Sequence, residues 1–131
     1  MAKAIGKRKT SQREAIYNVI RAAEGPLSVN QILDRGTAKV PKLGVATVYR
    51  CVKLLVEAGD IKPVTLPDDT TRYESSHLEH HHHFRCTKCE TVFDLPGCLM
   101  PIPNGSSLPN GFQVNGHEVT LIGICCECQK N

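Results

Sequence analysis

Apolar residues recur at helical spacing near the start of the chain, and polar capping signals precede them. Ser11 and Glu14 form a capping-box pattern, which predicts that a first helix begins there and runs to a stop at Gly25-Pro26. Ser28 and Gln31 repeat the pattern ahead of a second helix, which we expect to end near residue 36 or slightly later.

A third helical pattern begins near Val45 and is closed by Gly59. Its apolar stripe, which we expect to face the core, consists of Val48, Val52, Leu55 and Val56. Residues 61–66 and 71–74 then have the composition of two strands joined by a tight turn at 67–70. Three helices followed by a hairpin predict a winged helix-turn-helix with its wing at about 61–74.

In a winged helix the third helix enters the major groove of DNA, where its polar side chains reach bases and phosphates. The predicted contacts are Thr47, Tyr49, Arg50 and Lys53. Taken singly, Tyr49 is equally well explained as a half-buried aromatic between helices, and Lys53 as a solvated charge. Three-helix cores also serve as protein-docking modules, so the fold alone does not establish DNA binding.

The charge of the chain is unevenly distributed. The net charge is +3, but residues 1–75 hold thirteen Lys and Arg against eight Asp and Glu, whereas residues 76–131 hold three against five. Several basic residues that suit DNA phosphates come before the first acidic residue, Glu14. They include Lys7, Arg8, Lys9 and Arg13. A solvated tail is the alternative interpretation of this segment. The asymmetry places the basic partner surface in the N-terminal half. We expect two domains, a winged-helix domain at 1–75 and a dimerisation and metal-sensing domain at 76–131.

The second half of the chain contains two close cysteine pairs. Cys86 and Cys89 form one, and Cys125 and Cys128 form the other. Four thiolates in two Cys-x-x-Cys pairs are what a tetrahedral structural Zn²⁺ site requires. The odd total of seven cysteines argues against a closed set of disulfides. We therefore predict a zinc-bound, β-rich second domain and an α+β fold overall.

Four consecutive histidines precede the first cysteine pair, at positions 80–83. In a strand, alternate residues share a face, so His81 and His83 point one way and His80 and His82 the other. Two neighbouring metal sites become possible on this basis. Glu74 and Asp94 are carboxylates within reach, and imidazole with carboxylate suits Fe²⁺, Zn²⁺ or Mn²⁺.

Several other classes of protein are disfavoured. The sequence has no signal-peptide pattern and no run of about 18 apolar residues, so we expect a cytoplasmic protein with reduced thiols and no membrane association. It also has no glycine-rich phosphate loop or nucleophile elbow, so we expect neither enzymatic activity nor a small organic substrate.

Four motifs together resemble those of the ferric uptake regulator family of bacterial metalloregulators. They are the recognition-helix stretch 44–50, the wing end 72–74, the run His81-x-His83-x-x-Cys86-x-x-Cys89, and His117 placed eight residues before Cys125-x-x-Cys128. The resemblance implies a homodimer that represses metal-homeostasis genes, such as those for iron or zinc uptake, from two-fold operators in double-stranded DNA.

The resemblance also implies roles for individual residues. The four cysteines would hold structural zinc, and a sensed metal between the two domains would bind Glu74, His81, His83 and Asp94. A second family site would draw on His80 or His82 together with His117. Metal at the sensor site would tie the end of the wing to the dimerisation sheet, and so fix the spacing of two recognition helices.

The chain departs from the family pattern in two places. The iron and peroxide sensors of the family place a histidine after helix one, where this chain has Glu24-Gly25-Pro26. Either Glu24, His77 or water substitutes for it, or the sensor site is weak or retuned, so the sequence does not separate iron from zinc sensing. Residues 95–111, where relatives have a helix, contain four prolines, so we expect a loop there and strands at 91–94 and 112–125.

Other functions stay open at this stage. Within the same family, the chain would be a peroxide sensor if bound iron oxidised a ligand histidine, and Asp94 suits that role. From other classes, it would be a zinc-buffering or protein-docking module that never touches DNA, or, least favoured, a zinc hydrolase built on the histidines.

Overall fold

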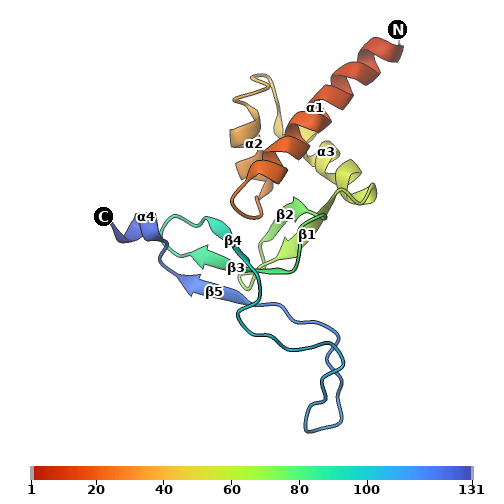
Figure 1. Ribbon diagram of the computed structural model, residues 1–131. Helices are drawn as coiled ribbons and strands as arrows, with labels where there is room; N and C mark the ends of the chain where they lie inside the picture. The colour runs from red at the N-terminus through yellow and green to blue at the C-terminus, as the bar shows by residue number, and fades with distance from the viewer. Residues whose placement is uncertain (1, 131) are drawn as a thin grey trace. The chain divides into compact units, whose positions relative to one another are not determined.

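The computed structural model describes residues 2–130, with side chains described from residue 11 onward. The chain separates into two compact units, Met1–Leu78 and Glu79–Asn131, which are described in turn. Figure 1 shows the elements of each unit along the chain.

The first unit contains three helices and a two-stranded hairpin. The helices are α1 (Ala2–Ala22), α2 (Val29–Gly36) and α3 (Val45–Glu57). Strands β1 (Ile61–Thr65) and β2 (Thr71–Ser75) pair in antiparallel register, with Ile61 opposite Ser75. This arrangement is the predicted winged helix-turn-helix. The boundaries of α2, α3 and the hairpin agree with the sequence prediction.

The predicted start of the first helix is wrong. Helix α1 already begins at Ala2, so Ser11 lies inside it and does not cap it. The preceding residues are mostly alanine, lysine and arginine with no proline, and such residues extend a helix readily. Lys7, Arg8 and Lys9 lie on this extension, and their side chains are outside the part of the structure described.

Sequence-local signals position α2 and α3. Ser28 accepts a hydrogen bond from the backbone N–H of Gln31 at 3.2 Å, and the Gln31 side chain accepts one from the backbone N–H of Ser28 at 2.9 Å. Gly59 ends α3 with a φ of 81°, which favours glycine because it has no Cβ.

The three helices enclose the apolar core of the first unit. The largest fully buried side chains there include Ile16 from α1, Ile32 from α2 and Val48 from α3. Val48, Val52 and Leu55 are buried as predicted, and Val56 is partly buried against them. Packing of this stripe against α1 and α2 leaves the other side of α3 free for the polar residues.

The second unit is a three-stranded sheet with the histidine strand at its centre. Its strands are β3 (His81–Cys86), β4 (Val92–Pro96) and β5 (Thr120–Gly123), in the order β4-β3-β5. Strand β4 is antiparallel to β3, and β5 is parallel to it. A short helix, α4 (Cys126–Gln129), follows β5. Because β3 is the central strand, it has β4 along one edge and β5 along the other.

The predicted strand over residues 112–125 is mostly wrong. Only Thr120–Gly123 forms a strand, and residues 112–114 instead bond to the preceding loop, with Val114 N–H donating to Ser106 O at 2.9 Å. Asn115-Gly116 follows, and both are residue types that favour turns over strands.

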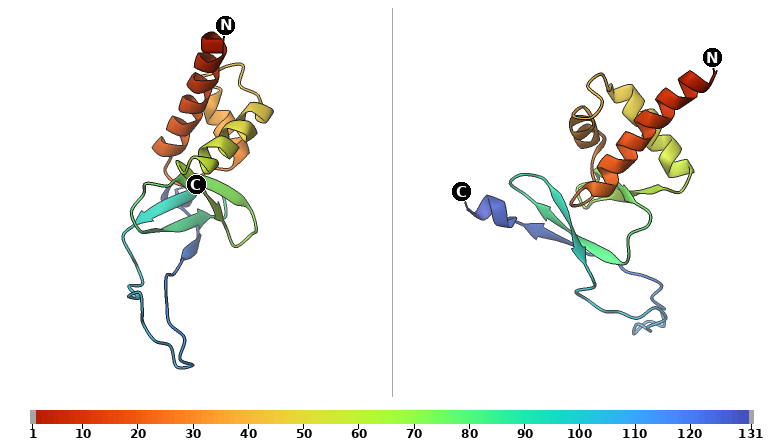
Figure 2. Two further views of the ribbon diagram at one scale, coloured as in Figure 1. Left: turned by 90° about the vertical axis from the view of Figure 1, so that its right-hand side faces the viewer. Right: turned by 45° about the horizontal axis from the view of Figure 1, so that its top comes forward.

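The segment between β4 and β5 forms a long irregular arm, defined here as residues 97–119. It contains no helix, as its prolines predicted. Figure 2 shows it leaving the sheet and returning to it in both views. Its internal backbone bonds include Leu108 N–H to Phe112 O at 2.7 Å and Gly105 N–H to Val114 O at 2.6 Å. The arm is therefore braced mainly against itself.

Among residues 2–130, no helix combines the length and the apolar character needed to cross a bilayer.

Candidate metal centres

The four predicted zinc ligands come together in the second unit. Cys86 ends β3, and Cys89 follows in the turn. Cys125 directly precedes α4, and Cys128 lies within that helix. All four sulfurs lie within 4.8 Å of one another. The Cys89 and Cys125 sulfurs are 3.9 Å apart, close to the separation of about 3.8 Å that a tetrahedral site with Zn–S bonds of about 2.3 Å requires. The donor set fits Zn²⁺.

The backbone prepares this cluster for a cation. The N–H groups of Cys89 and Cys125 each lie 3.4 Å from the Cys86 sulfur and donate to it. These bonds lower the pKa of Cys86 to about 6. The surrounding sulfurs, that of Cys125 foremost, raise the pKa of Cys128 to about 12. The crowded thiolates repel one another, and a divalent cation would relieve that repulsion.

A second cluster lies on one face of β3, where two histidines meet a carboxylate from β4. The His81 and His83 rings are 4.9 Å apart. Their Nε2 atoms lie 3.6 Å and 3.5 Å from the same Asp94 carboxylate oxygen. A tetrahedral site with bonds of about 2.0–2.2 Å separates nitrogen and oxygen ligands by about 3.4 Å, so these side chains could hold one ion without rearrangement of the strands.

The orientation of His81 also suits metal binding. Its Nδ1 lies 2.7 Å from the backbone carbonyl oxygen of Glu79. A ring nitrogen facing a carbonyl must carry the proton and donate it, which leaves the Nε2 lone pair facing Asp94. Metal-binding histidines are commonly fixed in this way by a hydrogen bond on the other ring nitrogen.

The fourth predicted sensor ligand, Glu74, belongs to the first unit. It lies on β2, is only 3% exposed, and its carboxylate is 3.7 Å from the Lys62 ammonium group. Glu24, one predicted substitute for the missing histidine after helix one, is engaged elsewhere. Both of its carboxylate oxygens accept hydrogen bonds from Arg35, at 2.7 Å and 2.8 Å. This ion pair lowers the pKa of Glu24 and gives that carboxylate a structural partner.

The opposite face of β3 brings together the residues predicted for a second site. The His80 ring lies 4.7 Å from that of His82 and 4.9 Å from that of His117. A cysteine that the sequence analysis did not place, Cys98, joins them. Burial and the neighbouring imidazoles lower the pKa of His82, which keeps it in the neutral form that binds metal. Cys51, by contrast, is buried in the apolar core of the first unit. Cys126 is exposed and belongs to none of the three clusters of possible metal ligands found among the described residues.

The predicted DNA-contacting side chains lie on the outer side of α3. Tyr49 is 59% exposed, which excludes the alternative of a half-buried aromatic. Arg50 donates a hydrogen bond to the Thr47 hydroxyl at 3.1 Å, and Lys53 is exposed. Arg13, on α1, is half-buried. Phenol and cationic groups are thus exposed on α3, and the Thr47 hydroxyl is partly exposed beside them.

Comparison with known proteins identifies the group to which this chain belongs. Residues 4–122 match the model of the ferric uptake regulator family. The chain is a member of that family. The "Peroxide operon regulator" of Bacillus subtilis is 30% identical over 130 residues, covering 98% of this chain and 88% of the relative. The "Ferric uptake regulation protein" of Synechococcus elongatus is 28% identical, with coverage of 96% and 88%.

Solved structures of the ferric uptake regulator family agree with this fold. A "zinc-bound manganese uptake regulator" superposes with a TM-score of 0.70 at 27% identity, covering 87% of each chain. The Helicobacter pylori ferric uptake regulator superposes with a TM-score of 0.63 at 21% identity, covering 92% of this chain and 81% of that one, and supports the fold alone. The predicted α+β fold is confirmed, and so is the predicted function class, a metal-responsive transcriptional regulator.

Proposed function

We propose that the chain is a homodimeric, DNA-binding repressor whose affinity for its operator rises when a divalent metal binds His81, His83 and Asp94. The family resemblance implies Glu74, of the first unit, as a further ligand. The observation that carries the proposal is the approach of both imidazole Nε2 atoms to one Asp94 oxygen, at 3.6 Å and 3.5 Å. Two imidazoles beside a carboxylate form a donor set suited to Fe²⁺, Zn²⁺ or Mn²⁺.

The proposal gives the cysteine cluster a separate, structural role. Zn²⁺ bound by Cys86, Cys89, Cys125 and Cys128 would hold α4 and the end of β5 to the end of β3. Four thiolates close the coordination sphere, so this ion has no open position for a signal or a substrate. Regulation is therefore assigned to the histidine and carboxylate cluster, whose lack of thiolates makes a weaker, exchangeable site.

The DNA-binding part of the proposal rests on the first unit. A winged helix presents α3 to the major groove, with Thr47, Tyr49, Arg50 and Lys53 on its accessible surface. Two copies related by a two-fold axis would read a two-fold operator. Metal raises DNA affinity only if the DNA-competent conformation binds metal more tightly than the other conformation does.

The test combines metal analysis with DNA binding. Protein that retains its tight zinc is stripped of labile metal and titrated with a duplex that the metal-loaded protein has selected from a random pool. We expect Fe²⁺, Zn²⁺ or Mn²⁺ to restore tight binding, Asp94→Asn to lose the response, and Glu118→Gln, an exposed carboxylate outside the clusters, to keep it. Equal DNA affinity with and without labile metal would refute the proposal.

Salt dependence separates a repressor from a zinc-buffering or docking module. Contact with several phosphates releases counterions, so DNA binding must weaken steeply as salt rises. Lys53→Gln is expected to reduce the slope of log affinity against log salt by about one, the share of one phosphate contact. A module that does not bind DNA shows no saturable binding at any salt concentration.

Peroxide sensing is a second candidate within the same family. The 30% identical relative from Bacillus subtilis is named a peroxide operon regulator, and Asp94 lies between two histidines that a bound iron could oxidise. Mass spectrometry after loading with Fe²⁺ and treatment with peroxide distinguishes the two functions. Oxygen added to His81 or His83 supports peroxide sensing, and unmodified histidines support metal sensing alone.

A further inference from the structure

The arm, residues 97–119, ends in an ordered turn that exposes two large apolar side chains. In this arm tip, defined as residues 108–112, the backbone N–H of Gly111 donates to Leu108 O at 2.9 Å, and that of Leu108 donates to Phe112 O at 2.7 Å. Even so, Leu108 is 47% exposed and Phe112 is 62% exposed. The backbone bonds therefore fix the turn without burying the apolar side chains that it carries.

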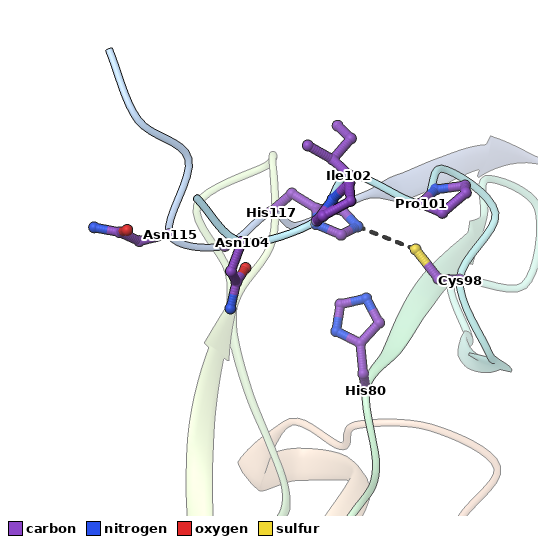
Figure 3. Close-up of a pocket in the computed structure, with 9 residues that line it drawn as sticks. His80, Cys98, Pro101, Ile102, Asn104, Asn115 and His117 are labelled. Carbon is purple, nitrogen blue, oxygen red and sulfur yellow. Dashed lines mark hydrogen bonds between the residues drawn. The ribbon is translucent and has the colours of Figure 1, made fainter. Parts of the chain in front are cut away.

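The base of the arm is held together as well. The Cys98 sulfur, near the start of the arm, lies 3.1 Å from Nε2 of His117, near its end, and Figure 3 shows this contact. Between base and tip, the N–H of Gly105 donates to Val114 O at 2.6 Å, and the N–H of Val114 donates to Ser106 O at 2.9 Å. A segment braced in this way loses little conformational freedom when it binds a partner.

The composition of the arm and of β5 is that of an interface. Glu118 is the one charged residue among residues 95–126, although 22% of the whole chain is charged. A surface in contact with water normally carries many charged residues, whereas the core of a protein interface is depleted of them. The large apolar side chains exposed on the arm are those of Leu99, Met100, Ile102, Leu108 and Phe112. The arm thus has the character of a surface that a partner covers.

Strand β5 has the same character and lies at the edge of the sheet. Leu121 and Ile122 are both exposed, and they point to opposite faces because successive residues of a strand alternate. Ile124, directly after the strand, is exposed too. An edge strand that is apolar on both faces pairs readily with other chains unless something covers it.

Size and charge favour a second copy of this chain as the partner. A four-residue strand is only about 13 Å long, so contact along β5 alone falls well short of the roughly 800 Å² per partner of a stable interface. The arm supplies further apolar surface, and in a two-fold dimer each contact occurs twice. Because residues 95–126 carry only the Glu118 charge, two copies of this surface meet with little like-charge repulsion.

We propose that the arm of each protomer crosses to a second copy of this chain, where Leu108 and Phe112 pack on the apolar side chains of the partner's β5. Crossed arms cover both edge strands and give both arm tips apolar surroundings. The inference rests on the homodimer of the proposed function and specifies which segment holds that dimer together. It depends neither on the sensed metal nor on DNA binding.

Sedimentation velocity of the zinc-loaded chain over a concentration series measures the contribution of the arm tip. We expect the unmodified chain to be dimeric. Phe112→Ser and Leu108→Ser should each raise the dissociation constant of the dimer at least about tenfold, because each dimer loses the contact twice. Leu54→Ser is the matched control, because Leu54, on α3 of the first unit, is also 47% exposed. That substitution should leave the dissociation constant unchanged.

The outcomes separate this inference from the proposed function. A dimer that both arm-tip variants leave intact would overturn the arm contact but not the proposed homodimer. A chain that stays monomeric at every concentration would overturn both.

Crosslinking locates the contact without relying on a loss of affinity. Benzoylphenylalanine in place of Phe112 is irradiated in an equilibrated mixture of isotopically labelled and unlabelled chains, so that crosslinks between copies have mixed isotope content. We expect crosslinks between copies that map to residues 120–124. Crosslinks confined to one chain, or crosslinks between copies that map elsewhere, would overturn the inference.

Discussion

Removal of the structural zinc is expected to unfold the second unit while the first stays folded. The two units differ in how much apolar core they possess. The main core cluster, which includes Ile16, Ile32 and Val48, lies entirely in the first unit. Among the described residues of the second unit, the buried apolar side chains are Cys86, Val92 and Cys125, and two of these are proposed zinc ligands.

The magnitudes favour complete loss of structure in the second unit. Burial of one valine such as Val92 contributes about 1.5–3 kcal/mol. Structural zinc in small domains contributes about 10–16 kcal/mol of apparent binding free energy, and a whole domain is stable by only about 5–15 kcal/mol. The few apolar contacts around Val92 therefore cannot offset the loss of the ion.

Hydrogen exchange measured by mass spectrometry checks this expectation peptide by peptide. After zinc removal, or in Cys128→Ser, amides of β3 and β5 such as that of His83 should exchange fully at the earliest time point, while those of α1–α3 remain protected. Cys126→Ser is the matched control and should behave like the unmodified chain. Continued protection of β3 in zinc-free protein, or loss of protection in α1–α3 as well, would refute the reasoning.

Three further predictions concern the first unit. Ser28→Ala removes one half of the capping box on α2 and should lower the free energy of unfolding by about 1 kcal/mol, measured by urea denaturation. Ile32→Ala should cost about 2–5 kcal/mol in the same assay, because Ile32 is fully buried. Glu24→Gln should cost at most about 1 kcal/mol, since its partly exposed pair with Arg35 is screened by solvent. The pair lowers the pKa of Glu24, so this cost should be present at neutral pH and vanish as pH falls through the lowered pKa. At neutral pH the substitution should leave the affinity for the sensed metal unchanged.

Features encoded by neighbouring residues could be predicted from the sequence. The capping box of Ser28 and Gln31, the glycine that ends α3 and the turn between β1 and β2 each depend on residues a few positions apart. The cysteine spacing similarly indicated a zinc cluster, because each Cys-x-x-Cys pair is a local pattern and two such pairs supply the four ligands of a tetrahedral site. One local signal was misleading, because the capping pattern at Ser11 lies inside a longer helix.

Features that depend on distant pairing could not be predicted in the same way. The strand after the arm pairs in parallel with β3, so that His83 lies opposite Thr120, and no local pattern specifies that register. Cys98 was missed as a partner of His82 for the same reason, because sixteen positions separate them and the proline-rich arm follows no regular geometry. The one available signal was the position of Cys98 directly after a strand that pairs with the histidine strand.

The alternation of side chains along β3 explains how adjacent histidines can serve different sites. His81 and His83 meet Asp94 on one face, whereas His80 lies beside the rings of His82 and His117. Chain neighbours should therefore act independently in metal binding.

We accordingly expect His81→Ala to lose metal-dependent DNA binding and His80→Ala, on the other face of the strand, to keep it. Titration of each variant with Fe²⁺, Zn²⁺ or Mn²⁺ in the DNA-binding assay measures both outcomes. Loss of the metal response in both variants would mean that the two faces form one coupled site. Loss in His81→Ala alone would mean that the alternation of side chains along the strand keeps the sensed metal on one face.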